Sequence, residues 1–146
     1  MENLETLVLV ADQIDARACH YLAPALMKMT NLRDLFLSNN QIYYKGCVHL
    51  APALMNMSQL KILALSSNGI DAKACKHLAP ALTGMTQLEE LFLSKNLIDD
   101  EACEYLALAL VKMAKLNRLI MHENPISEGS KQVIRAWCRD ECEVVL

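Results

Sequence analysis

The chain of 146 residues is poor in aromatic side chains and in glycine, with two phenylalanines, one tryptophan and four glycines. It has no excess of basic residues, and its net charge of -3 argues against nucleic-acid binding, which needs a basic face. Its longest apolar run, Tyr105 to Val111, is far shorter than the ~20 residues of a membrane span. Catalytic Ser/His/Asp or Cys/His spacings, a phosphate-binding glycine loop and an HExxH motif are also missing. We therefore expect a non-enzymatic protein with no cofactor, metal site, nucleic-acid partner or membrane segment.

The sequence is instead 53% hydrophobic, and its apolar residues follow a 28-residue repeat. This hydrophobic content excludes disorder as the main state of the chain. Five units start near residues 4, 32, 60, 88 and 116 and read L-x-x-L-x-L-x-x-N-x-I, with Asp12 replacing Asn in the first unit. The pattern is a signature of leucine-rich repeats, in which each unit buries its apolar face against its neighbours.

The second half of each unit has helical periodicity. In the first unit Ala18, Leu22, Ala23 and Leu26 fall at i, i+4, i+5 and i+8, which is one face of a helix. Each unit is therefore predicted to be a strand, a turn and a helix, and residues 1–146 to be one domain. Residues 127–146 are predicted to form a cap, with a helix from about Glu128 to Arg139 and a short strand in which Val144 falls 28 residues after Leu116.

The repeat resembles the ribonuclease-inhibitor-like class of leucine-rich repeats over residues 4–126, because a 28-residue unit has room for a full helix. The sequence segments HLAPAL, MTNL and LFLSNN are similar to the C-terminal repeats of NLR innate immune receptors. The resemblance implies an α/β fold, a curved right-handed solenoid with a parallel sheet on its concave side and helices on its convex side. It also implies protein–protein recognition, and related repeats occur in the Ran GTPase-activating protein and in some bacterial effectors.

Two polar columns recur with the same 28-residue spacing. Asn40, Asn68, Asn96 and Asn124 predict a buried ladder, because amides can both donate to and accept from the backbone of the turns. Cys19, Cys47, Cys75 and Cys103 recur once per helix, so neighbours should lie ~8–10 Å apart, beyond the ~4.4–6.8 Å Cα separation of a disulfide. We expect free, buried thiols and a reducing, cytoplasmic location. Cys138 and Cys142 lie outside this column, where a thiol couple or a ligand pair is an alternative to a role in the cap.

Strand residues alternate in direction, so the positions between the leucines are predicted to face solvent on the concave side. They form three columns: Thr6, Asp34, Ile62, Glu90 and Arg118; Val8, Phe36, Ala64, Phe92 and Ile120; Val10, Ser38, Ser66, Ser94 and His122. The second column is apolar, and exposed apolar surface rimmed by charge is typical of a binding site. We predict a partner-binding site made of Val8, Asp34, Phe36, Ala64, Glu90, Phe92, Lys95, Arg118, Ile120 and His122. The alternative is that the two phenylalanines only pack for sheet stability.

Two other functions stay open at this point. One is regulation of a GTPase, for which Arg118 is the only basic residue of the three columns. The other is a structural solenoid that self-associates. A strand over residues 4–10 would be an open apolar edge, so we expect either the C-terminal part of a longer protein or a homodimer paired through this edge.

Overall fold

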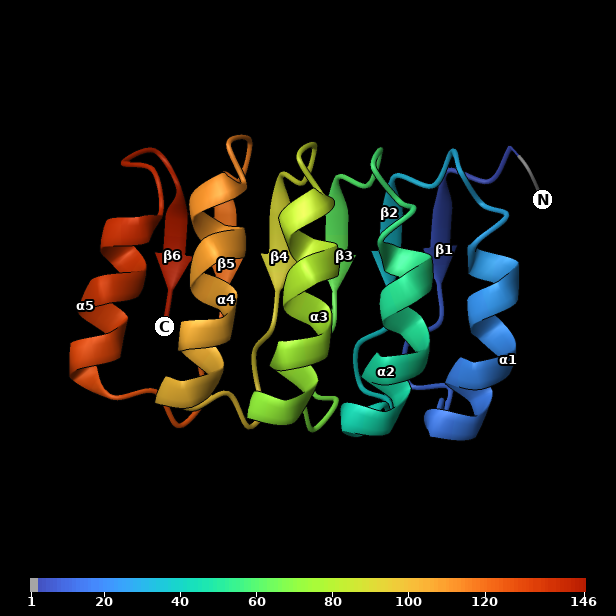
Figure 1. The fold of residues 1–146 in the computed structure, drawn as a ribbon, viewed down its shortest axis with the longest axis horizontal. Coiled ribbons are helices and arrows are strands. Elements are labelled where there is room, and N and C mark those ends of the chain that lie inside the picture. The colour runs from blue at the N-terminus through green and yellow to red at the C-terminus, as the bar shows by residue number, and fades with distance from the viewer. Residues whose placement is uncertain (1–2) are drawn as a thin grey trace.

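The computed structural model describes residues 3–146, which form strands and helices in strict alternation. The elements are β1 (Thr6–Val8), α1 (Ala16–Leu26), β2 (Asp34–Phe36), α2 (Tyr43–Leu54), β3 (Ile62–Ala64), α3 (Ala72–Gly84), β4 (Glu90–Phe92), α4 (Asp100–Lys112), β5 (Arg118–Ile120), α5 (Glu128–Trp137) and β6 (Glu143–Val145). The strands pair in chain order as one parallel sheet, and all the helices lie on one face of it (Figure 1). The predicted α/β solenoid is confirmed.

The register of the sheet repeats the register of the sequence. From β1 to β5 each strand pairs with residues 28 positions further on, as in Leu7 with Leu35 and Leu35 with Leu63. The core lies between sheet and helices, where the leucines of the L-x-x-L-x-L motif in repeats two to five are buried almost completely. Leu4, Leu7 and Leu9 of the first repeat are only partly buried, because β1 has a neighbouring strand on one side only. Each fully buried leucine contributes roughly 1.5–3 kcal/mol.

The predicted terminal strand is present, but its register differs from the prediction. Val144 pairs with Leu119 rather than continuing the column of Leu116, so the last spacing is 25 residues. Helix α5 ends at Trp137, two residues before its predicted end, because Cys138 has extended backbone angles. The cap is therefore three residues shorter than a regular repeat. Trp137, Cys138 and Val144 pack against the core at this end of the molecule.

The asparagine column forms the predicted ladder along the turns. The Asn96 amide donates to Leu65 O and Leu93 O, both at 3.0 Å, while its oxygen accepts from Asn68 N at 2.9 Å and Ile70 N at 3.0 Å. Neighbouring asparagines share carbonyls, since Leu65 O also accepts from the Asn68 amide at 3.1 Å. The ladder therefore joins each repeat to the next one through polar groups that would otherwise be buried unpaired.

The ladder is incomplete at the junction of the second and third repeats. Helices α1, α3 and α4 begin at an aspartate whose side chain caps the first turn, as Asp15 does by accepting from Ala18 N at 2.8 Å. The second repeat has Tyr43 at that position, with a φ of 48°, and α2 begins there without a described side-chain cap. In this altered turn Tyr43 N donates to Asn68 O at 2.9 Å. The buried Asn68 Oδ1 accepts no hydrogen bond from any residue in 3–146.

Candidate functional site

The predicted site lies on the face of the sheet opposite the helices, here called the open face, which corresponds to the predicted concave side (Figure 1). The second column forms an apolar row across it, in the register Val8, Phe36, Ala64, Phe92, Ile120. Val8 is 60% exposed, and Phe36, Phe92 and Ile120 are half-buried. Strand β6 extends the row with Val145, which pairs with Ile120 and is 37% exposed. Val145 was missed because the cap departs from the 28-residue spacing.

Ala64 does not present a side chain to a partner as predicted. It is only 5% exposed, because its single methyl group lies in register between Phe36 and Phe92 on the two adjacent strands. The two phenylalanines are two strand spacings apart, ~9.6 Å along the sheet. Ala64 thus forms the floor of the row, and the aromatic rings beside it provide the accessible surface.

The first column carries the charge of the open face, and its members are paired with one another. Thr6 donates from Oγ1 to Asp34 Oδ2 at 2.9 Å. Arg118 lies 3.7 Å from Glu90 and 2.8 Å from Glu143, the residue that β6 adds to this column. The hydrogen bond that Arg118 Nε donates to Glu143, together with the charges of Glu143 and Glu90, raises the pKa of Arg118 above its usual value. Arg118 is therefore held in place by two carboxylates.

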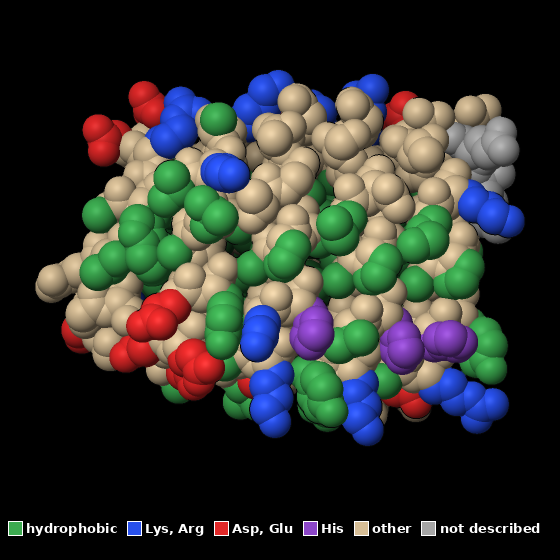
Figure 2. Space-filling view, viewed as in Figure 1, with side chains coloured by type: hydrophobic (Ala, Val, Ile, Leu, Met, Phe, Trp, Pro, Cys, Tyr) green, Lys and Arg blue, Asp and Glu red, His purple; other side chains and the backbone are tan. Residues whose placement is uncertain are grey.

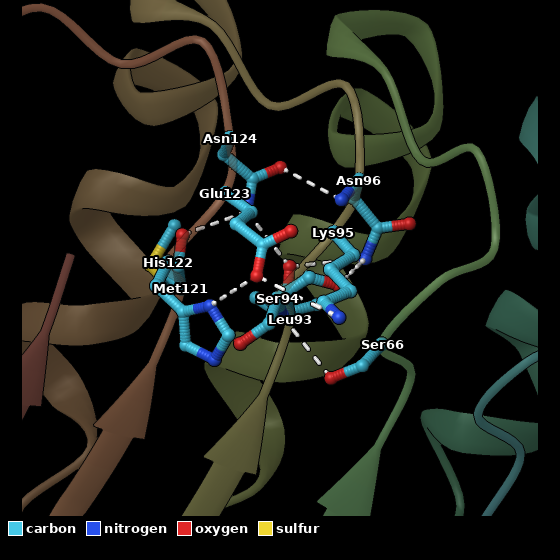
Figure 3. A network of polar contacts seen from close by, with 9 residues as sticks. All are labelled: Ser66, Leu93, Ser94, Lys95, Asn96, Met121, His122, Glu123 and Asn124. Atoms are coloured by element: carbon cyan, nitrogen blue, oxygen red, sulfur yellow. Dashed lines mark hydrogen bonds and ion pairs between the residues drawn. The ribbon is translucent and has the colours of Figure 1, made fainter.

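Lys95 and His122 meet through a residue that lies between them. Glu123 Oε1 is 3.6 Å from Lys95 Nζ and 3.3 Å from His122 Nδ1, and Figure 3 shows this cluster with Asn96 and Asn124 of the ladder. Lys95 and Glu123 both have a positive φ, and so do Ala11, Asn39 and Ser67 at the equivalent positions. Each non-glycine residue in this conformation costs roughly 1–2 kcal/mol. The left-handed turn directs the chain from each strand toward the ladder, and the varied residues at this position give no sequence signal for it.

The third column is less exposed than predicted. Ser94 is only 5% exposed, and its backbone N–H donates to Ser66 Oγ at 3.1 Å (Figure 3). The Ser94 hydroxyl is buried without a described partner. Val10 and His122 remain accessible at the two ends of this column. The accessible site is thus the apolar row with the paired charges on one side and the Lys95–Glu123–His122 cluster on the other.

The described residues, 3–146, set limits on the chemistry of the site. They contain no group of three or more His, Cys, Asp or Glu side chains arranged to hold a metal ion. Within the same range, no helix combines the length and the hydrophobicity that crossing a bilayer requires. All six cysteines are free thiols, and those in the helical column are buried, as predicted.

The 28-residue unit, the parallel sheet with helices on one face and the asparagine ladder define a leucine-rich-repeat solenoid. No protein-family model matches the chain, and no curated protein matches it either.

Among solved structures the chain is similar to an internalin of Listeria monocytogenes at 19% identity and a TM-score of 0.40, covering 82% of this chain and 42% of that one. It is also similar to a leucine-rich repeat protein of Leptospira interrogans (18%, TM-score 0.35, covering 98% and 49%). A third similar structure is an internalin C2 of Listeria monocytogenes (16%, TM-score 0.39, covering 99% and 80%). The chain spans less than half the length of the first two proteins. The fold assignment depends on the chain's own repeat and sheet.

Proposed function

We propose that the protein is a non-enzymatic recognition module that binds a protein partner across its open face. The observation that carries this proposal is the apolar row, in which Val8, Phe36, Phe92, Ile120 and Val145 stay accessible on a face that no described helix covers. Aromatic side chains on a rigid sheet make effective anchors, because little conformational entropy is lost when a partner packs on them. Five or six strands provide a contact area of about 800 Å² per partner, typical of a specific interface.

The charges around the row determine which partners fit. Arg118 between Glu90 and Glu143, and Glu123 between Lys95 and His122, form alternating rather than single-signed patches. Such a rim selects orientation more than it adds affinity. We expect a partner with one or two apolar side chains for the row, flanked by polar groups of both signs.

A narrower proposal concerns the setting of the module. The sequence segments HLAPAL, MTNL and LFLSNN support a role for the module as the ligand-sensing part of an NLR-like innate immune receptor in the cytoplasm. The GTPase-regulator alternative has less support, because two carboxylates already engage the guanidinium of Arg118, which would have to reach a transferring phosphate.

The test is a pull-down from lysate with proteomic identification, using the wild type and the Phe36→Ser/Phe92→Ser variant. The matched control is Leu108→Ser/Val111→Ser, which removes two exposed apolar side chains from α4 on the helix side. We expect a partner that the wild type and the control retain and that the phenylalanine variant loses. Retention of every partner by the phenylalanine variant would refute the proposal.

Thermal unfolding separates binding from packing. If the phenylalanine variant fails to fold, the two rings serve sheet stability, and Val8→Asp/Val145→Asp becomes the test of binding. These two side chains are the most exposed of the row, so their replacement should alter the melting temperature little. A folded Val8→Asp/Val145→Asp variant that keeps all partners would also overturn the proposal.

A further inference from the structure

A second surface lies on the helix side of the molecule, in a groove between α1 and α2. The groove has a volume of ≈ 450 Å³ and a mostly apolar lining that includes Tyr21, Tyr44 and Val48. Tyr21 is 67% exposed, and Tyr44 and Val48 are each 38% exposed. Outward positions of such helices are ordinarily polar. Stacking of the repeats therefore gives no reason for three large apolar side chains here.

Two imidazoles join the two helices across this groove. The rings of His20 on α1 and His49 on α2 have centroids 5.0 Å apart, in an edge-to-face arrangement. His20 also contacts Tyr21 edge-on at 5.2 Å. Histidine side chains gather on this part of the helix side, close to hydrophobic ones (Figure 2). Their ring nitrogens supply hydrogen-bond donors beside the apolar side chains of the lining.

Cations occupy the end of the groove at which the helices begin. Arg17 and Lys45 belong to its lining, and Lys73 on α3 continues the series, with its amine 5.8 Å from the centroid of the Tyr44 ring. All three side chains stand in the first turn of their helices, where a positive charge opposes the helix dipole. Helix stability thus disfavours these cations, and α4 carries Asp100 and Glu101 in its own first turn instead.

The charge of the groove is of one sign. Of the residues that the structure describes, none that lines it is acidic. The nearby Asp15 carboxylate caps α1 through Ala18 N. On the helix side the acidic side chains gather mainly over the opposite end of the solenoid, away from α1 and α2 (Figure 2). A ligand in the groove therefore meets apolar surface, imidazole donors and two unopposed cations.

We propose that the groove between α1 and α2 is a docking site for an acidic amphipathic segment of a partner protein. The apolar face of the segment would lie along Tyr21, Tyr44 and Val48, and its carboxylates would meet Arg17, Lys45 and the imidazoles. Charge complementarity selects this occupant over a basic or neutral segment. The site is separate from the open face, so it allows one module to hold two partners.

The test measures fluorescence anisotropy with a fluorescein-labelled synthetic peptide that repeats Glu-Glu-Leu-Leu, an acidic amphipathic helix. A peptide with Gln in place of Glu has the same apolar face without the charge. We expect saturable binding of the acidic peptide, at least tenfold weaker binding of the neutral one, and marked weakening at high salt. Absence of saturable binding, or equal affinity for both peptides, would overturn the proposal.

Variants locate the binding on the protein. Arg17→Glu/Lys45→Glu should weaken binding of the acidic peptide at least tenfold, while Lys28→Glu/Arg135→Glu, which changes the net charge equally at other exposed positions, should not. The groove variant should fold normally, since acidic residues suit a first helical turn. If the two variants bind the acidic peptide with equal affinity, the peptide binds outside the groove between α1 and α2. Tyr21→Ser tests the apolar lining without removing a charge, and an unchanged affinity would refute that part.

A second copy of the chain is the competing occupant, because α4 presents Glu101, Glu104 and exposed Leu108. Analytical ultracentrifugation over a range of protein concentrations measures the mass in solution and so distinguishes a second copy of the chain from a partner segment as the occupant of the groove. Self-association that Glu101→Lys/Glu104→Lys abolishes would assign the groove to α4 of another copy and overturn the partner proposal. The Phe36→Ser/Phe92→Ser variant should bind the acidic peptide like the wild type, so failure of one proposal leaves the other standing.

Discussion

Replacing single asparagines of the ladder tests how the repeats are joined. In Asn96→Ala the carbonyl of Leu65 keeps a second donor, the Asn68 amide, and the carbonyl of Leu93 keeps the Asn124 amide. The backbone N–H groups of Asn68 and Ile70 lose the acceptor that the Asn96 oxygen provides. At ~1–3 kcal/mol for each stranded buried group, we expect a loss of about 3–4 kcal/mol in the free energy of unfolding.

Asn68→Ala is the matched control within the same column. Its side-chain oxygen accepts no hydrogen bond from the described part of the chain, so its removal strands no N–H group. Leu37 O and Leu65 O keep the amides of Asn40 and Asn96. The two substitutions remove the same side-chain atoms from buried positions, and we expect Asn68→Ala to cost about 1 kcal/mol, the net contribution of ordinary hydrogen bonds.

Urea unfolding followed by far-UV circular dichroism gives both free energies. Fluorescence of Trp137 reports on the terminal cap, and coincidence of the two signals checks that unfolding is two-state. The informative quantity is the difference between the variants, about 2–3 kcal/mol. Equal destabilisation by Asn68→Ala and Asn96→Ala would show that the acceptor side of the amide contributes nothing, and would refute the reasoning.

Two further predictions concern small side chains between the helices. Gly46→Ala should lower the melting temperature even though alanine favours helices, because the new Cβ would lie 2.7 Å from Cγ2 of Ile42; a higher melting temperature would contradict this. Burial raises the pKa of Cys19 to about 11 and that of Cys47 to about 12, whereas unfolded thiols ionise near ~8.5. From about pH 9 to pH 11 the unfolded state therefore holds fewer protons than the folded state, so the free energy of unfolding should fall as pH rises. Below pH 8 both states keep the thiols protonated, and the contribution of the two cysteines to stability is fully present. Thermal melts should show a smaller pH dependence in Cys19→Ala/Cys47→Ala, and an identical slope would refute the assignment.

Most of the fold could be predicted from the sequence because the repeat makes each residue's surroundings a copy of its neighbour's. Leu35, Leu63 and Leu91 are buried for the same reason, and the asparagines bond as their spacing indicates. The apolar row was predictable as well, because the repeat aligns equivalent strand positions across the sheet. Binding of a partner by this row remains a proposal, because the repeat predicts only which side chains lie next to one another on the sheet.

The departures arise where a residue depends on something other than the repeat. Ala64 is buried because of the size of its two cross-strand neighbours, which a column pattern does not weigh. Glu143 and Val145 join the open face because the cap is three residues short. The groove on the helix side combines two neighbouring helices whose outward residues differ from those of α4. Each of these features needs the packing of particular side chains, and composition or period alone does not specify it.

The altered turn at Tyr43 removes one link of the asparagine ladder between the second and third repeats. Elsewhere the amide oxygen of each asparagine ties the turn of the preceding repeat, but at this junction that tie is missing. Each repeat contacts only its neighbours, so the missing tie is local to this junction, which keeps the hydrogen bond from Tyr43 N to Asn68 O. The two phenylalanines of the open face lie on opposite sides of this junction, Phe36 before it and Phe92 after it. The angle between the second and third repeats therefore sets the separation of the two rings.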